Sequence, residues 1–174
     1  MEDVEIRVSA DQHIEVHRYA PGAIALTVAA ALVLQAFLPV HFAWTRMLEL
    51  PLLVTIYFAL SRRNASIGLL LGMTVGLLQD ALSGTPIGLY GIAKTLVGYA
   101  ASSIGARIDV EHWASRFLLT VGFFFFHHAV FALTRRLLLG QHETYLTVPL
   151  LLAALVNGAV ALGLFPLLDR LRKS

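Results

Sequence analysis

The fold is decided by residues 65–105, which run ASIGLLLGMTVGLLQDALSGTPIGLYGIAKTLVGYAASSIG. This stretch holds two apolar segments, 65–82 and 86–105, separated by only three residues. Each is long enough for a helix that crosses the hydrocarbon core of a bilayer, which takes about 17–25 residues. Because the connection is so short, the two helices must run antiparallel and side by side. The stretch therefore predicts a hairpin of two membrane-spanning helices.

Four more apolar segments flank this hairpin, which gives six in all. They cover residues 23–42, 47–60, 114–133 and 146–168. The segment 47–60 has only 14 residues, so its helix must extend back through Ala43 to reach a spanning length. Pro51 and the preceding Glu49 suit a helix start, because proline has no N–H to leave unpaired there and an acid favours the positive end of the helix dipole.

The composition supports a membrane protein. The chain has 174 residues and no cysteine, with 57% hydrophobic and 14% charged residues, against about 25% charged in a typical soluble domain. So short a chain could not bury this much apolar side chain in water. We exclude a soluble globular enzyme, a disordered protein and a disulfide scaffold, and we expect an all-α integral membrane protein built as a six-helix bundle. The net charge of +2 gives no reason to expect nucleic-acid binding.

The distribution of lysine and arginine predicts the orientation. With the N-terminus inside, nine basic residues fall on the inner side and three on the outer side, which predicts that both termini are cytoplasmic. The inner residues are Arg7, Arg18, Arg62, Arg63, Arg107, Arg116, Arg170, Arg172 and Lys173, and the outer ones are Arg46, Arg135 and Arg136. The chain then divides into a cytoplasmic tail (1–22), a transmembrane domain (23–168) and a basic cytoplasmic tail (169–174).

The N-terminal tail is acidic, which is not typical of a signal peptide. Val4, Ile6 and Val8 alternate with polar residues, as do Ile14 and Val16. This pattern fits a β-hairpin of two short strands. A disordered tail is the alternative, because an isolated hairpin is only marginally stable in water.

Small residues form a stripe along each helix of the central hairpin. Gly68, Gly72 and Gly76 recur every four residues, and Gly91 and Gly98 belong to a similar series in the next segment. Helices in lipid associate through close packing, which small residues permit. We therefore expect the two helices to pack on each other or on a common neighbour. The alternative is a groove for another protein's helix or for a small ligand.

Two charged residues lie inside the spans. Asp80 lies near the outer end of one helix of the hairpin, and Lys94 lies two turns into the next. Charged residues inside a membrane normally face the protein interior, so we predict an Asp80–Lys94 ion pair. The alternative is that Asp80 caps the turn through backbone N–H groups while the Lys94 side chain reaches water.

Three features of the last two spans carry weaker predictions. The adjacent His127 and His128 point about 100° apart on a helix, so they cannot share a metal ion, although one of them could meet Glu49. Asn157 should hydrogen-bond between helices. The connection 134–145 should lie on the membrane face with its arginines on lipid phosphates, or else meet an extracytoplasmic partner.

Residues 76–99, GLLQDALSGTPIGLYGIAKTLVGY, resemble the signature of the rod shape-determining protein MreD family. Residues 50–60, LPLLVTIYFAL, are similar to that family's second span. Length, span number and the basic C-terminal tail also agree, and the resemblance covers residues 23–168. Asp80, Gly84, Pro86 and Gly88 carry over as motif residues with a structural or interface role, and no catalytic residue carries over.

The resemblance implies an inner-membrane subunit of the bacterial cell-elongation machinery, which synthesises peptidoglycan. It also implies the partners: the bitopic protein MreC, and in a larger complex RodA, a class B penicillin-binding protein and MreB. The implied fold is similar to that of the six-helix substrate-binding subunits of energy-coupling-factor vitamin transporters.

Three functions are therefore distinguished, and the first is the one we expect. The first is a non-catalytic scaffold that needs no cofactor or metal. The second is the substrate-binding subunit of a transporter, which requires a polar cavity with Asp80, Lys94 and Asn157 as candidate ligands. The third is an intramembrane enzyme, for which Asp80 with Lys94 is the one acid–base candidate.

Overall fold

The computed structural model describes residues 19–108, 110, 112–141 and 147–171. Within these residues the chain is a bundle of six α-helices without strands, as expected from the apolar segments. The N-terminal residues 1–18, where a β-hairpin is predicted, lie outside this range. The helices are α1 (Pro21–His41), α2 (Leu50–Arg62), α3 (Ala65–Ser83), α4 (Leu89–Gly105), α5 (Trp113–Leu139) and α6 (Val148–Asp169), with a 3₁₀ turn η1 (Ala43–Met47) before α2.

Four of these helices, α1, α3, α5 and α6, are long and apolar enough to cross a membrane. The predicted backward extension of α2 is wrong. Ala43–Met47 form the separate turn η1, and Leu48 and Glu49 are not helical, with φ/ψ of −83°/141° and −123°/66°. The chain is thus broken where the sequence suggested a continuous helix, and α2 keeps only 13 residues.

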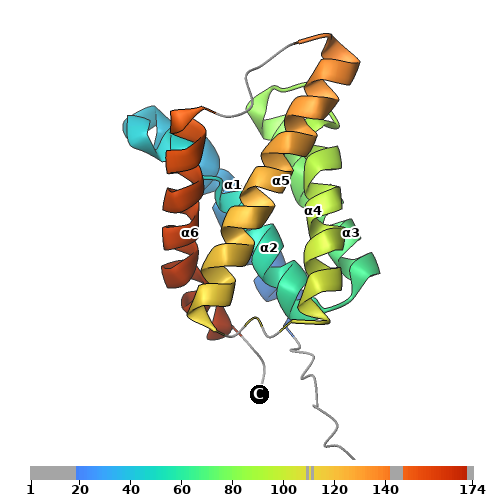
Figure 1. Cartoon of the computed structure of the whole chain (residues 1–174), viewed down its shortest axis with the longest axis vertical. Coiled ribbons are helices and arrows are strands. Elements are labelled where there is room, and N and C mark those ends of the chain that lie inside the picture. Colours follow the sequence, from blue (N-terminus) through green and yellow to red (C-terminus); the bar gives the residue numbers. More distant parts are fainter. Residues whose placement is uncertain (1–18, 109, 111, 142–146, 172–174) are drawn as a thin grey trace, which may run out of the picture.

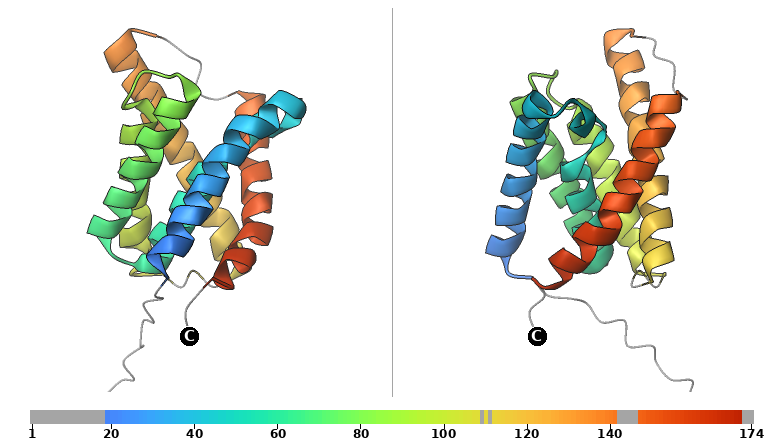
Figure 2. Two further views of the ribbon diagram at one scale, coloured as in Figure 1. Left: turned by 180° about the vertical axis from the view of Figure 1, so that it is seen from behind. Right: turned by 90° about the vertical axis from the view of Figure 1, so that its left-hand side faces the viewer.

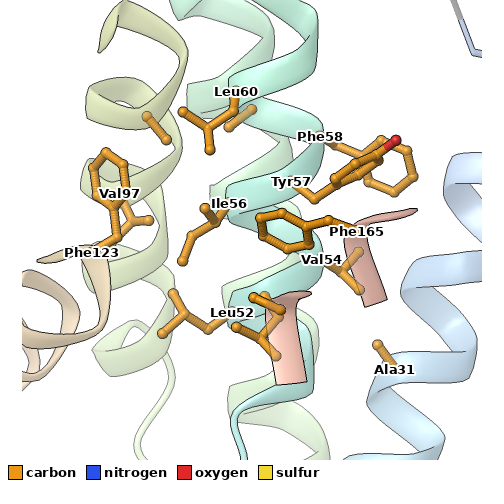
Figure 3. Close-up of a cluster of buried hydrophobic side chains, with 14 of the residues drawn as sticks. Ala31, Leu52, Val54, Ile56, Tyr57, Phe58, Leu60, Val97, Phe123 and Phe165 are labelled. Atoms are coloured by element: carbon orange, nitrogen blue, oxygen red, sulfur yellow. The ribbon is translucent and has the colours of Figure 1, made fainter. Parts of the chain in front are cut away.

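The short helix α2 lies at the centre of the bundle. It contacts each of the other five helices, and every residue from Pro51 to Ser61 is buried. Figure 3 shows its side chains between Val97 of α4 on one side and Ala31 of α1 on the other. A helix enclosed in this way does not have to match the thickness of the bilayer, because its neighbours form the lipid-facing surface.

The connections are short, and helices that follow each other in sequence contact each other. Because the number of helices is even, α1 begins and α6 ends at the same end of the bundle (Figures 1 and 2). We call this the basic end, since it carries five arginines that lie in connections or close to helix ends: Arg62, Arg63, Arg107, Arg116 and Arg170. The far end, which we call the opposite end, carries Arg46, Arg135 and Arg136.

The longest helix, α5, corrects one prediction about the opposite end. Residues 134–139 do not leave the helix to lie along a membrane surface but continue α5 as far as Leu139. Gly140, with φ 65°, then ends the helix in the left-handed conformation that glycine adopts without strain. With 27 residues, α5 is about 40 Å long, and it extends beyond the other helices (Figures 1 and 2).

Candidate functional site

The three glycines of α3 lie against the backbone of α4. A Cβ atom on Gly72 would lie 2.0 Å from the carbonyl oxygen of Lys94, and one on Gly76 would lie 2.4 Å from that of Tyr90. A Cβ on Gly68 would lie 1.9 Å from the hydroxyl oxygen of Ser102. Glycine is required at these positions because the partner atoms of Gly72 and Gly76 belong to a helix backbone, which cannot move aside as a side chain can.

The glycines of α4 complete this contact. A Cβ on Gly98 would lie 2.1 Å from the carbonyl oxygen of Gly68, and one on Gly91 would lie 2.9 Å from Leu77. The two small-residue stripes therefore face each other inside the bundle. They are occupied by this contact, so the groove considered as an alternative does not run along them.

Asp80 is held by the turn between α3 and α4. Its carboxylate accepts hydrogen bonds from the backbone N–H groups of Gly88, Tyr90 and Gly91 at 2.9, 2.9 and 3.0 Å, and from the Thr85 hydroxyl at 3.0 Å. These N–H groups belong to the start of α4, where no helical carbonyl can accept from them. The structure therefore has the alternative arrangement considered for Asp80, in which its carboxylate caps the turn through backbone N–H groups.

The motif glycines shape the same turn. Gly84 has φ 64° and Gly88 has φ 107°, and both values favour glycine because it has no Cβ. Gly88 is the residue just before α4, and its own N–H points to Asp80. The apolar segment 86–105 therefore becomes helical only from Leu89, because residues 85–88 form the turn around the carboxylate.

The predicted Asp80–Lys94 ion pair is also wrong. The Lys94 ammonium lies 3.6 Å from the Glu49 carboxylate and 3.2 Å from Nε2 of His127. It also lies 4.6 Å from the centre of the Tyr90 ring. The Lys94 side chain is 0% exposed, so it does not reach water either. Glu49 and His127 meet through this lysine and not directly.

Two side-chain amides hold the broken link between η1 and α2. Gln35 of α1 donates to the Leu48 carbonyl and accepts from the Leu50 N–H, both at 2.9 Å. Asn157 of α6 accepts from the Glu49 N–H at 2.9 Å and donates to the Met47 carbonyl at 2.7 Å. Backbone groups that leave a helix inside a membrane must find such partners. The interhelical role expected for Asn157 is confirmed.

Gln35 was missed by sequence reasoning. The one available signal was a single amide in an otherwise apolar segment, in which its neighbours are alanine, leucine, valine and phenylalanine. An amide is costly to bury without partners, so its presence in a span indicates that backbone groups nearby need both a donor and an acceptor.

We expect Gln35→Met to lower the free energy of unfolding by about 1–3 kcal/mol, because it leaves two partly buried backbone groups without their partners. The measurement is the melting temperature of the purified protein in detergent. Thr27→Val in the same helix is the matched control, since the one bond of the Thr27 hydroxyl among the described residues is to the carbonyl of Ala23, one turn earlier. An equal loss in both variants would contradict the assigned role.

A second polar cluster ties four helices together at the basic end. The Tyr57 hydroxyl donates to Asp169 at 2.7 Å and lies 2.9 Å from the Tyr19 hydroxyl. Arg116 pairs with the other oxygen of Asp169 at 2.9 Å and donates to the Val110 carbonyl at 3.0 Å. The cluster therefore joins the residues just before α1 to the middle of α2, the start of α5 and the end of α6.

Two cavities of about 550 Å³ each open on the sides of the bundle, and both are lined almost entirely by apolar atoms. The α1–α3 groove lies between residues 21–33 of α1 and 71–82 of α3, with Arg62 also in its wall. The α4–α5 groove lies between residues 100–108, which begin in α4, and 115–126 of α5. Asp80, Lys94 and Asn157 line neither groove, and their polar atoms are bonded to other groups of the protein.

Comparison with known proteins adds one positive result. A family model described as rod shape-determining protein MreD matches residues 18–174. This match includes all six helices and the turn around Asp80. No curated protein and no solved structure gives a significant match.

Proposed function

The chain belongs to the MreD family of rod shape-determining membrane proteins, and from this premise we propose that it is a non-catalytic scaffold of the cell-elongation machinery. In this role it binds MreC and links it to RodA, a class B penicillin-binding protein and MreB. The family match over nearly the whole chain carries the proposal. The interior polar groups support it, because Asp80, Lys94 and Asn157 are engaged in holding turns and helices together.

The proposed location is the bacterial inner membrane, with both termini in the cytoplasm. The basic end then faces the cytoplasm, as the positive-inside tendency requires. The six-helix domain covers residues 23–168, and 1–22 and 169–174 are cytoplasmic tails. We also propose that the fold is similar to that of the vitamin-transporter subunits.

The orientation can be tested by labelling a Ser174→Cys variant. The new cysteine should react with a membrane-impermeant maleimide only after the inner membrane is opened, and labelling of intact spheroplasts would refute this orientation.

We assign the single transmembrane helix of MreC to the α4–α5 groove. The groove is lined by the small residues Ala100, Ser115 and Gly122, between larger residues such as Phe123 and Phe126. A Cβ on Gly122 would meet no atom within 4 Å, so this glycine is not needed for packing within the bundle. Small residues on an open helix face allow another helix to approach closely.

We expect Gly122→Leu to reduce the recovery of MreC in affinity purification from native membranes by tenfold or more while the melting temperature stays unchanged. The added side chain would occupy part of the groove, and its Cβ would meet no atom within 4 Å. Gly163→Leu is the matched control, because Gly163 of α6 is exposed and also has no atom within 4 Å of a Cβ. Normal MreC recovery with Gly122→Leu would place the contact elsewhere.

A scaffold of this kind acts through differential affinity: it must bind its partners better in one arrangement of the machinery than in another. Within the part of the chain that the structure describes, the transporter alternative receives no support, since its candidate ligands are bonded to protein groups and the α1–α3 and α4–α5 grooves are apolar. A small molecule bound to the purified chain in place of MreC would restore that alternative.

A further inference from the structure

The α1–α3 groove differs from the α4–α5 groove because a cation lies in its wall. Residues 21–33 of α1 and 71–82 of α3 supply apolar side chains along its length. Arg62, the last residue of α2, lines the groove at the basic end of the bundle. This position corresponds to the level of the lipid headgroups, where the exposed Trp113 at the start of α5 also lies.

Nε of Arg62 has no hydrogen-bond partner within the part of the chain that the structure describes. This atom is buried, and Nε of the adjacent Arg63 is in the same state. A buried polar atom without a partner is costly, and a guanidinium is matched best by a carboxylate or a phosphate. The basic end therefore presents unsatisfied donors for an oxyanion at one end of an apolar groove.

We propose that the α1–α3 groove binds one anionic phospholipid, with the phosphate on Arg62 and an acyl chain lying between α1 and α3. The phosphate of this ligand matches Arg62, and its acyl chain matches the apolar walls of the groove. The charged donors lie where a headgroup lies, and the apolar walls continue from there into the hydrocarbon region. Neither feature is used by the contact that we assign to MreC.

The cation in the wall of the groove favours a phospholipid over a helix. A helix laid against the groove would bring apolar side chains and no oxyanion to Arg62. A phospholipid supplies both an oxyanion and an apolar chain, and its phosphate stays at the membrane surface.

The proposal is tested on the full-length chain purified in a neutral detergent, with phosphatidylglycerol and phosphatidylethanolamine as probes. Bound lipid is counted by native mass spectrometry, and stability is followed as melting temperature. We expect one phosphatidylglycerol to remain bound and to raise the melting temperature more than phosphatidylethanolamine does. Arg62→Gln should lower the preference for the anionic lipid about fivefold, the factor associated with one basic residue at an anionic surface.

Two further variants separate the parts of the site. Ala29→Phe fills the groove without changing its charge and should weaken the binding of both lipids. Arg107→Gln, at an exposed arginine of the same end that lines neither groove, should bind as the native chain does. Equal binding of the two lipids, no effect of Arg62→Gln, or the same stabilisation by inorganic phosphate alone would overturn the proposal. If Ala29→Phe binds both lipids normally but no longer recovers MreC, the groove belongs to a partner helix, and the lipid proposal is overturned as well.

Discussion

Replacing Gly72 with leucine is expected to leave the chain unable to form its bundle. The new side chain would start from a Cβ only 2.0 Å from the carbonyl oxygen of Lys94, so α3 and α4 would have to separate along their whole contact. Inserting atoms into a packed core costs about 1–3 kcal/mol where neighbours can shift. Here the neighbour is backbone, and we expect a loss above about 3 kcal/mol in the free energy of unfolding. The measurement is the fraction recovered as a monodisperse species, together with its melting temperature.

Leucine at Gly163 supplies the control for this experiment, because the same atoms added there meet open space. Alanine at Gly72 should already destabilise the protein, since its single added carbon is the one that collides. If Gly72→Leu melts at the native temperature, α3 and α4 do not approach each other as closely as the structure has them.

The second large effect is expected at the buried pair of Glu49 and Lys94. Lys94→Met removes the cation and leaves the Glu49 carboxylate without its partner 3.6 Å away. Breaking a buried pair by removing one member costs about 3–5 kcal/mol, whereas replacing both members is often nearly neutral. We therefore expect Lys94→Met to lower the melting temperature strongly and Glu49→Gln/Lys94→Met to recover most of the loss.

Asp80 provides the test of specificity. Its carboxylate is bonded to the turn between α3 and α4 and not to Lys94. Asp80→Ala combined with Lys94→Met should therefore be worse than either change alone. Recovery of stability in that double variant would show that the lysine depends on Asp80, and would contradict the arrangement of charges described above.

Much of the architecture could be predicted because its signals are local in sequence. The lengths of the apolar segments indicated the helices, and the spacing of Gly68, Gly72 and Gly76 indicated the face on which α3 meets its neighbour. The even number of predicted helices indicated that α1 begins and α6 ends at the same end of the bundle. Each of these inferences needs only the period of a helix and the thickness of a membrane.

The polar interior could not be predicted in the same way. Which carboxylate meets Lys94 depends on how deep α2 and α4 lie relative to each other, and no periodic pattern records that depth. Glu49 was interpreted as a favourable residue at a helix start, yet its side chain turns inward to Lys94. The break before α2 was missed because Gln35 and Asn157, which satisfy its backbone, lie 15 and 108 residues away from the groups they bind.

The enclosed position of α2 has a consequence for how the protein is made. When only the first three helices have been synthesised, α2 is already in the membrane, but with 13 residues it is too short to span the bilayer by itself. One of the two amides that anchor the start of α2, and the ring that packs against Tyr57, arrive with the last helix, at Asn157 and Phe165. We therefore expect chains truncated before α6 to be less stable than the full chain and to be degraded by membrane proteases.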